Sequence, residues 1–251
     1  MSKLKNAPVI YALCQVRFSP VLRIGDHIPD IQERHRKAFP RFAEQQVQTI
    51  QFVPGENLPK PDFRKRWVFT DKPNRTGFVI HQDSVVFHTT QYDVFESFLD
   101  SFRAVLKSID ELAEVDLSER IGLRFIDFVV SRPSLALDDL VRDELKGFRM
   151  DDATQVFHQE DTICDTPAGR MRFRLTRGIH QSPLPPDLQS SLEMNVEVPS
   201  EPSIILDTDH FNEETRDFDV EEICRLIDDL HRHTGTAFRA AVTKEALKAW
   251  Q

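Results

Sequence analysis

The nine residues S-V-V-F-H-T-T-Q-Y, Ser84 to Tyr92, have a counterpart in S-I-I-L-D-T-D-H-F, Ser203 to Phe211. Each segment begins with β-branched and apolar residues, a composition typical of a strand. Each is followed by a helix-starting motif, D-V-F-E at Asp93 and D-V-E-E at Asp219, whose carboxylates can cap free backbone amides. We therefore predict that the two segments are equivalent strands, each leading into a long helix.

A third pair of segments supports a repeat. R-K-R-W-V-F, from Arg64, matches R-M-R-F-R-L, from Arg170. The three offsets are 106, 119 and 126 residues (170 − 64, 203 − 84 and 219 − 93), so the order is kept with two insertions in the second copy. The alternative to a repeat is that the three matches arise by coincidence, because strand and helix-cap patterns of this kind are common.

The repeat defines the expected architecture. We predict an α+β protein of two related halves, residues 1–116 and 117–251, each an antiparallel sheet with a short and a long helix. A single half would leave one sheet face uncovered, so we expect the halves to pack together as one globular unit.

Residue patterns place the individual elements. Helices are expected to begin at Asp30, Asp93, Ser134 and Asp219, and a proline-rich loop is expected at Pro54 to Pro61. Apolar residues at helical spacing predict two buried faces, which contain Phe98, Phe102 and Ile109 and, in the last helix, Ile223, Ile227 and Leu230. The strands are expected at Val9–Phe18, Val47–Val53, Arg64–Thr70, Phe78–Ile80, Ser84–Thr90, Ile121–Val130, Thr154–His158, Arg170–Thr176, Glu193–Val198 and Ser203–Thr208.

The composition predicts a cytoplasmic protein without a membrane segment. No apolar run approaches the roughly 20 residues that span a bilayer, and the first residues lack the pattern of a signal peptide. Cys14, Cys164 and Cys224 are isolated, which argues against a disulfide framework or a thiolate zinc site. The net charge of −9 disfavours general nucleic-acid binding but allows a local basic patch.

Three segments resemble a sporadically distributed, uncharacterised family of bacterial proteins of about this length. They are N-A-P-V-I-Y-A-L-C-Q-V-R-F-S-P, S-E-R-I-G-L-R-F-I-D, and L-D-T-D-H-F with L-H-R-H-T-G-T-A-F-R-A-A-V-T-K-E. The resemblance implies no reaction and no site residues. The patchy distribution of the family suggests an accessory role, such as a toxin–antitoxin or phage-defence module. The strand–helix–strands–helix unit is also similar to SecB-like chaperones and helix-grip folds.

An acidic segment is the first candidate site. Asp207 and Asp209 lie two apart on a predicted strand and so share a face, and His231 follows on the last helix. Two carboxylates and an imidazole are suitable ligands for a divalent metal, or partners in acid–base chemistry. The structural alternative is that aspartates at a strand end cap local backbone groups. The sequence contains no metal-binding motif around these residues, so we expect no cofactor.

Alternating arginines are the second candidate site. Arg170, Arg172 and Arg174 share one face of a predicted strand, and Arg64 and Arg66 lie at the matching positions of the first copy, beside Trp67. Guanidinium groups bind phosphates and carboxylates in bidentate geometry. We predict that these six residues bind an anionic partner, which could be an acidic protein segment, a nucleotide or a single-stranded nucleic acid. The alternative is a solvated face neutralised by neighbouring acidic strands.

The sequence gives little support for nucleophilic catalysis or for phosphate binding by a glycine-rich loop. No nucleophile-elbow, dinucleotide or phosphate-loop motif occurs, and Cys164 lies between acids that disfavour a thiolate. L-P-P-D-L, Leu184 to Leu188, is either a docking element or a surface loop. We therefore predict a non-enzymatic binding or accessory protein that recognises a protein or peptide, and homo-oligomerisation is compatible with this role. The alternatives are a binder of nucleotides or other small anions and, third, a metal-dependent hydrolase.

Overall fold

The computed structural model describes residues 4–51, 60–188 and 190–251. Short-range residue preferences account for most elements, and strand boundaries fall mainly at proline, glycine and polar residues. The elements of the first part of the chain are β1 (Val9–Phe18), α1 (Ile24–His35), β2 (Arg41–Gln51), β3 (Lys60–Thr70), β4 (Thr76–Ile80), β5 (Ser84–Thr89) and α2 (Phe95–Ala113).

The second part of the chain contains a longer central strand and a longer helix. Its elements are β6 (Leu117–Val129), two 3₁₀ turns at Leu137–Asp139 and Asp143–Leu145, β7 (His158–Thr166), β8 (Gly169–Gly178), β9 (Ser203–Asn212), β10 (Arg216–Asp217), α3 (Val220–Ala241) and α4 (Lys244–Ala249). None of the helices in the described ranges is both long enough and apolar enough to cross a membrane.

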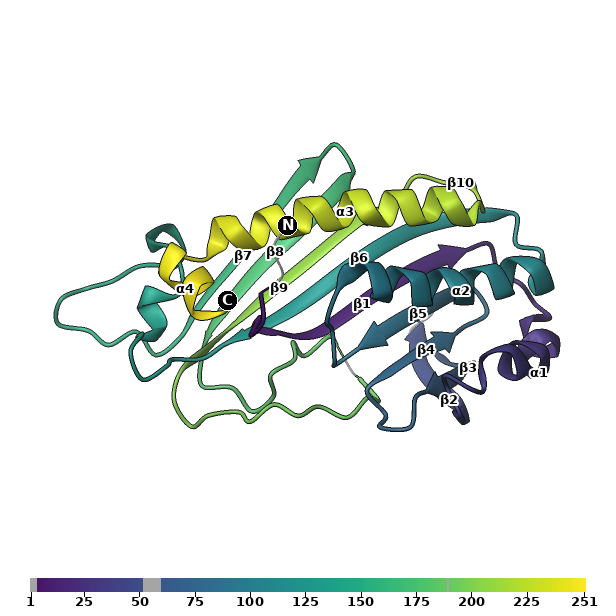
Figure 1. Cartoon of the computed structure of the whole chain (residues 1–251), viewed down its shortest axis with the longest axis horizontal. Coiled ribbons are helices and arrows are strands. Elements are labelled where there is room, and N and C mark those ends of the chain that lie inside the picture. Colours follow the sequence, from purple (N-terminus) through teal and green to yellow (C-terminus); the bar gives the residue numbers. More distant parts are fainter. Residues whose placement is uncertain (1–3, 52–59, 189) are drawn as a thin grey trace.

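The strands form one antiparallel sheet of ten strands, in the order β2-β3-β4-β5-β1-β6-β9-β8-β7 with β10 paired to β6. Figure 1 shows α2 and α3 lying side by side across one face of this sheet. The fold is therefore α+β with a large antiparallel sheet, as the sequence predicts at this coarser level. The central pair β1 and β6 joins the strands of the first part to those of the second.

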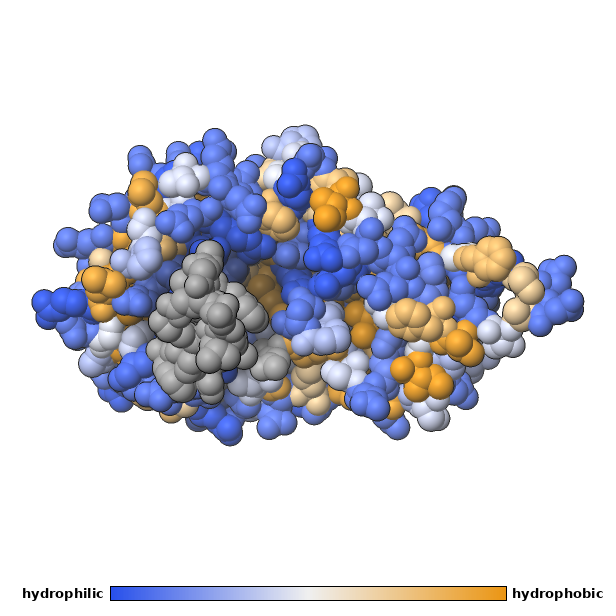
Figure 2. Space-filling model, turned by 180° about the vertical axis from the view of Figure 1, so that it is seen from behind, coloured by the Kyte–Doolittle hydropathy of each residue, from blue (hydrophilic) through white to orange (hydrophobic). Residues whose placement is uncertain are grey.

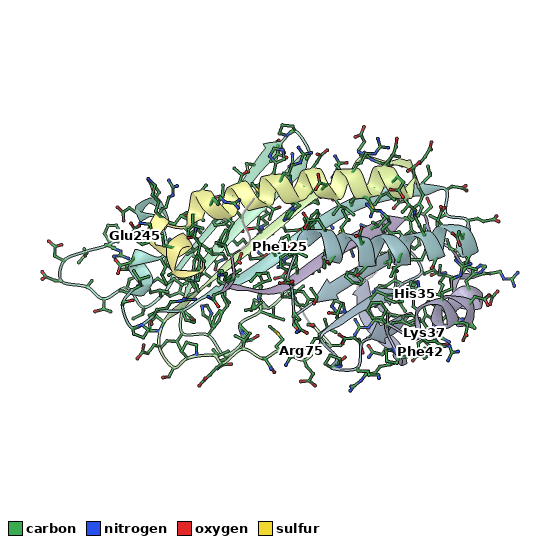
Figure 3. All side chains as sticks on the ribbon, in the orientation of Figure 1. His35, Lys37, Phe42, Arg75, Phe125 and Glu245 are labelled. Atoms are coloured by element: carbon green, nitrogen blue, oxygen red, sulfur yellow. The ribbon has the colours of Figure 1, made fainter. Side chains whose placement is uncertain are left out.

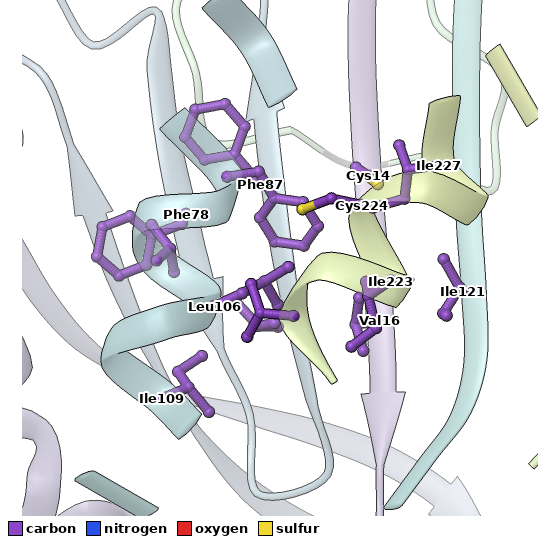
Figure 4. Close-up of a cluster of buried hydrophobic side chains, with 14 of the residues drawn as sticks. Cys14, Val16, Phe78, Phe87, Leu106, Ile109, Ile121, Ile223, Cys224 and Ile227 are labelled. Atoms are coloured by element: carbon purple, nitrogen blue, oxygen red, sulfur yellow. The ribbon is translucent and has the colours of Figure 1, made fainter. Parts of the chain in front are cut away.

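The main core lies between the helices and the sheet. Every second residue of β1, from Ala12 to Phe18, faces α2 and α3, because strand side chains alternate between faces. Figure 4 shows this packing around Phe87, Leu106 and Ile223. The six residues predicted for the two buried helix faces are all buried, namely Phe98, Phe102, Ile109, Ile223, Ile227 and Leu230.

The opposite face of the sheet is partly covered by residues 179–188 and 190–202 of the long connection after β8. Leu184 and Leu188 pack against a second apolar cluster that includes Tyr11 and Ile126. The segment predicted as a docking element is therefore, in large part, a cover for this sheet face. The strand expected at Glu193–Val198 is also absent, since residues 193–198 cross this face without strand pairing.

Several predicted element starts are wrong. Helix α1 begins at Ile24 rather than Asp30, because Ile24, Ile28 and Ile31 share its buried face. Helix α2 has Val94 rather than Asp93 at its N-cap, and the Val94 side chain makes no capping hydrogen bond. Asp219 does cap α3, since its carboxylate accepts a hydrogen bond from the Glu222 amide at 2.8 Å.

Two other elements of the second part also differ from the prediction. The α-helix expected from Ser134 is absent, and two 3₁₀ turns follow instead, the first beginning at Leu137 with Ala136 at its N-cap. The strand expected at Thr154–His158 begins only at His158, as the charged edge strand β7. This strand has no clear apolar alternation, which explains why the pattern missed it. Most of the proline-rich loop expected at Pro54 to Pro61 lies outside the described residues.

The sheet positions of the matched segments agree only in part. β5 and β9 correspond, because each pairs with the first strand of its part and each precedes a long helix. The arginine-bearing strands do not correspond. β8 pairs directly with β9, whereas β3 is separated from β5 by β4. The match between the segments beginning at Arg64 and Arg170 therefore reflects shared strand composition rather than equivalent positions.

Candidate functional site

A pocket of about 520 Å³ opens between α2, α3 and the sheet. Its floor contains Phe125 and Asp127 of β6 and Thr208 of β9. Phe125 and Thr208 are direct partners in the sheet, and Asp127 is two residues further on the same face. Figure 3 labels Phe125, which lies between the beginning of α2 and the middle of α3. The opening of the pocket is surrounded by exposed charged side chains, namely Lys5, Asp93, Glu96, Asp228 and Arg232.

Asp127 is the most unusual residue of this floor. Its side chain is buried, with only 7% of the residue exposed, and it has no hydrogen-bond or ion-pair partner among the described residues. Burial raises the pKa of its carboxyl from 3.8 to about 7. Its oxygens are not among the fully enclosed polar atoms without a partner, so the carboxyl group is largely desolvated but opens onto the pocket. A carboxylate that is largely desolvated and has no protein partner destabilises the folded state. Such groups are candidates for ligand contacts because the ligand can supply the missing partner.

Aromatic rings form the walls above Asp127. The imidazole of His231 stacks on Phe95 with centroids 3.7 Å apart and an interplanar angle of 8°. Tyr92 meets Phe125 edge-on at 5.1 Å, and Phe238 closes the wall toward the end of α3. Burial lowers the pKa of His231, although the nearby Asp228 and Glu96 oppose this effect. Below the charged side chains at the opening, the walls are thus mainly aromatic, with one carboxyl group at their base.

Gly235 lies in the middle of α3 and also lines this pocket. It follows His231 by four residues and precedes Phe238 by three, so it lies on the helix face that carries these aromatic rings. A glycine in a helix interior costs about 1 kcal/mol relative to alanine. The missing side chain leaves room beside the rings. Two locally unfavourable residues, Asp127 and Gly235, therefore meet at one cavity, which is where functional constraint is expected.

The predicted arginine residues do not form one site. β3 and β8 are six positions apart in the sheet order, which is about 29 Å at about 4.8 Å per strand. Trp67 is buried on the face under the helices, where its indole N–H donates to Glu44 at 3.1 Å. Arg172, by contrast, pairs with Asp161 on the opposite face. A groove lined by both Trp67 and Arg172 is therefore not present.

Most of the predicted arginines have carboxylate partners. Arg170 binds Asp165 and Arg172 binds Asp161 across β7 and β8, both through Nε at 2.8 Å. The remaining partners are Asp187 and Asp207 for Arg174, Asp83 for Arg64 and the amide of Gln45 for Arg66. These arginines therefore lie on a face neutralised largely by acidic residues, which is the alternative interpretation of the sequence. Anion binding by these residues stays a prediction.

Asp207 belongs to a buried ion pair. β9 continues to Asn212, so Asp207 and Asp209 lie within the strand rather than at its end. Asp207 is 2% exposed and accepts two hydrogen bonds from Arg124, at 2.7 and 2.8 Å. Its predicted role as a backbone cap is therefore wrong. Burial disfavours the charge of Arg124, but the hydrogen bonds that it donates to Asp207 and Asp187, together with their negative charges, outweigh burial and raise its pKa.

The three metal-site candidates are not brought together. Asp207 and Asp209 face the side of the sheet that carries Arg124, whereas His231 lies on α3, on the helix-covered side. The sheet separates the carboxylates from the imidazole. Within residues 4–51, 60–188 and 190–251, no group of three or more His, Cys, Asp or Glu residues is arranged to hold a metal ion.

Sequence reasoning missed most of the pocket, although two signals for it were present. Asp127 interrupts the apolar run L-R-F-I-D-F-V-V, and Gly235 interrupts the helical pattern of α3. A polar residue in a buried strand and a glycine inside a helix are both local exceptions with a structural or functional cause. Only the three-dimensional arrangement shows that both line one cavity.

No family model matches this sequence, and no curated protein is significantly similar to it.

Proposed function

We propose that the protein is a non-enzymatic binding protein that holds a small amphipathic organic molecule in the pocket between α2 and α3. The observation that carries the proposal is that Asp127, at the floor of a cavity of about 520 Å³, is buried and has no partner within the described part of the chain. Cavities of about 300–1,000 Å³ with apolar walls and few polar groups are typical of small-molecule sites. The aromatic walls supply the apolar contact, and Asp127 supplies a single directional polar contact.

The location of Gly235 provides the test. Replacing Gly235 with Leu adds four carbon atoms on the helix face that lines the pocket. Leucine also has a higher helix propensity than glycine, by roughly 0.8 kcal/mol, so the variant is expected to remain folded. We expect wild-type protein to bind the neutral fluorescent probe N-phenyl-1-naphthylamine at one site and Gly235→Leu to bind it at least tenfold more weakly.

Fluorescence titration measures both affinities, and circular dichroism checks that the variant is folded. Gly25→Ala serves as a control for a glycine change in another helix, since Gly25 lies in α1 and does not line this cavity. Absence of probe binding by wild-type protein, or equal binding by wild type and Gly235→Leu, would refute the proposed site.

An exposed apolar surface supports a second candidate function, recognition of a protein or peptide. Phe148 and Val156 are 82% and 78% exposed, and Met150, Phe157 and Ile179 are also exposed. Figure 2 shows apolar side chains at the end of the molecule that carries this segment. Exposed apolar patches commonly mark interaction surfaces. A toxin–antitoxin or defence-associated partner is one proposal for its occupant.

Sedimentation velocity distinguishes between a second copy of this chain and a different protein as the occupant of this patch. If a second copy covers it, wild-type protein sediments as a dimer and Phe148→Ser shifts it to a monomer. If the occupant is a different protein, the purified chain remains a monomer, and Phe148→Ser abolishes binding of that partner only.

We also propose that the two parts of the chain, residues 1–116 and 117–251, arose by duplication of one unit. The corresponding positions of β5 and β9, each followed by a long helix, support this. On this proposal the arginine segments of β3 and β8 acquired similar sequences independently. Superposition of β1, β5 and α2 on β6, β9 and α3 tests it, with the strand directions and helix crossing expected to agree.

A further inference from the structure

We propose that the ligand of the α2–α3 pocket carries a protonated primary amine on an apolar, aromatic-sized frame, and that Asp127 is the counter-ion of this amine. The inference rests on the proposed function and adds the chemical class of the ligand. It follows from the charge of the floor, the partners of the surrounding cations and the chemistry of the walls.

The floor lacks a cation. No ion pair to Asp127 occurs among the described residues, although three basic side chains line the pocket. Arg232 pairs with Asp228 at 3.4 Å and also with Asp229, and Arg239 donates to the Gly235 carbonyl at 2.9 Å. Lys5 is exposed at the rim. Since none of the described residues supplies the positive charge that would stabilise the Asp127 carboxylate, we assign this charge to the ligand, with a proton in its place when the pocket is empty.

An inorganic cation does not suit this environment. Calcium takes six to eight oxygen ligands and magnesium needs near-octahedral oxygen coordination. The floor offers the carboxylate of Asp127 and the hydroxyl of Thr208, between Phe125 and the aromatic walls. An ammonium group needs fewer oxygen partners, because it donates up to three hydrogen bonds. It also gains from aromatic rings nearby through cation–π attraction.

An anionic ligand is disfavoured at the same position. A phosphate or carboxylate placed on the floor would meet the negative charge of Asp127 in a site shielded from water, where repulsion is stronger than in solution. Tyr92, Phe95, Phe125 and Phe238 instead offer apolar contact to a ring or alkyl frame. The combination of one buried carboxylate and an aromatic wall therefore favours an amphipathic amine over a nucleotide.

Dansylcadaverine provides the test, because it joins a primary ammonium group to a fluorescent naphthalene ring by an alkyl chain. Its N-acetyl derivative has a similar shape and no charge on that nitrogen. At pH 8, where the carboxyl of Asp127 is mostly ionised and the amine is protonated, we expect wild-type protein to bind the amine at least tenfold more tightly than the acetyl derivative. Asp127→Asn should remove this preference.

A charge control and the neutral probe make the outcomes distinguishable. Asp165→Asn removes one negative charge on β7, outside this pocket, and should keep the full amine preference. If the neutral probe binds but the amine and its acetyl derivative bind equally, or if Asp127→Asn keeps the preference, the amine assignment is wrong and the pocket proposal stands. If the neutral probe does not bind either, the proposed function itself is wrong.

Discussion

Asp127→Asn is expected to stabilise the protein at pH 8 and to have a much smaller effect near pH 5. The folded-state pKa of this carboxyl is about 7, above its ordinary value of 3.8, because burial disfavours the charged form. Below pH 4 both the folded and unfolded states hold the proton, so stability is fully present. Between pH 4 and 7 the unfolded chain releases the proton while the folded chain retains it, and stability falls with rising pH. Asparagine has no such transition.

The expected difference in unfolding free energy between the two proteins changes with pH at a defined rate. The difference in unfolding free energy between Asp127→Asn and wild type should increase by about 1.4 kcal/mol per pH unit between pH 5 and 7 and then level off. The total shift from 3.8 to about 7 sets an upper bound of about 4 kcal/mol. Urea unfolding of both proteins from pH 5 to pH 8 measures the gap, and all other titratable groups are common to both proteins. A gap that is constant with pH would show that Asp127 is ionised throughout or has a partner.

Asp207→Ala is expected to destabilise the protein by about 3–5 kcal/mol, the range for removing one member of a buried ion pair. The reason is that Arg124, whose side chain is 10% exposed, would lose both of its close hydrogen bonds to Asp207. Asp187 remains near Arg124 at 3.0 Å, but this carboxylate is half exposed and can replace only part of the interaction. Thermal or urea unfolding measures the loss.

Asp165→Ala is the matched control. It removes a carboxylate from the exposed pair with Arg170, whose side chains are 74% and 57% exposed, and exposed pairs contribute less than about 1 kcal/mol. The double variant Arg124→Met with Asp207→Leu should recover much of the stability, because an apolar pair removes the buried unpaired charge. Equal, small losses for Asp207→Ala and Asp165→Ala would show that the Arg124–Asp207 pair is not buried in solution.

The sequence predicts the fold class and the helix cores because these depend on local periodicity. The apolar spacing from Phe98 to Ile109 is sufficient to place the buried face of α2. Strand β7 was misplaced because its residues are mostly exposed and charged, so no apolar alternation marks it. The order of strands in the sheet depends on long-range pairing, which similar local sequences such as those around Arg64 and Arg170 do not encode.

The site was predicted less well than the fold for the same reason. Alternating arginines are conspicuous in the sequence, but their significance depends on which strands lie beside them. In the structure β7 provides Asp161 and Asp165 as partners for Arg172 and Arg170. Asp127 and Gly235 are single residues that lie 108 positions apart in sequence (235 − 127), and their shared cavity arises from the packing of α3 on β6 and β9.

The central claim is that Asp127 is a buried, unpaired carboxyl group that a cationic ligand neutralises. Carbon-13 NMR of the Asp127 carboxyl, assigned by comparison with Asp127→Asn, measures its pKa directly with and without saturating dansylcadaverine. The account predicts a pKa of about 7 in the free protein and a decrease of at least one pH unit in the complex, since an ammonium partner stabilises the carboxylate. An ordinary aspartate pKa in the free protein, or a pKa that the bound amine leaves unchanged, would contradict it.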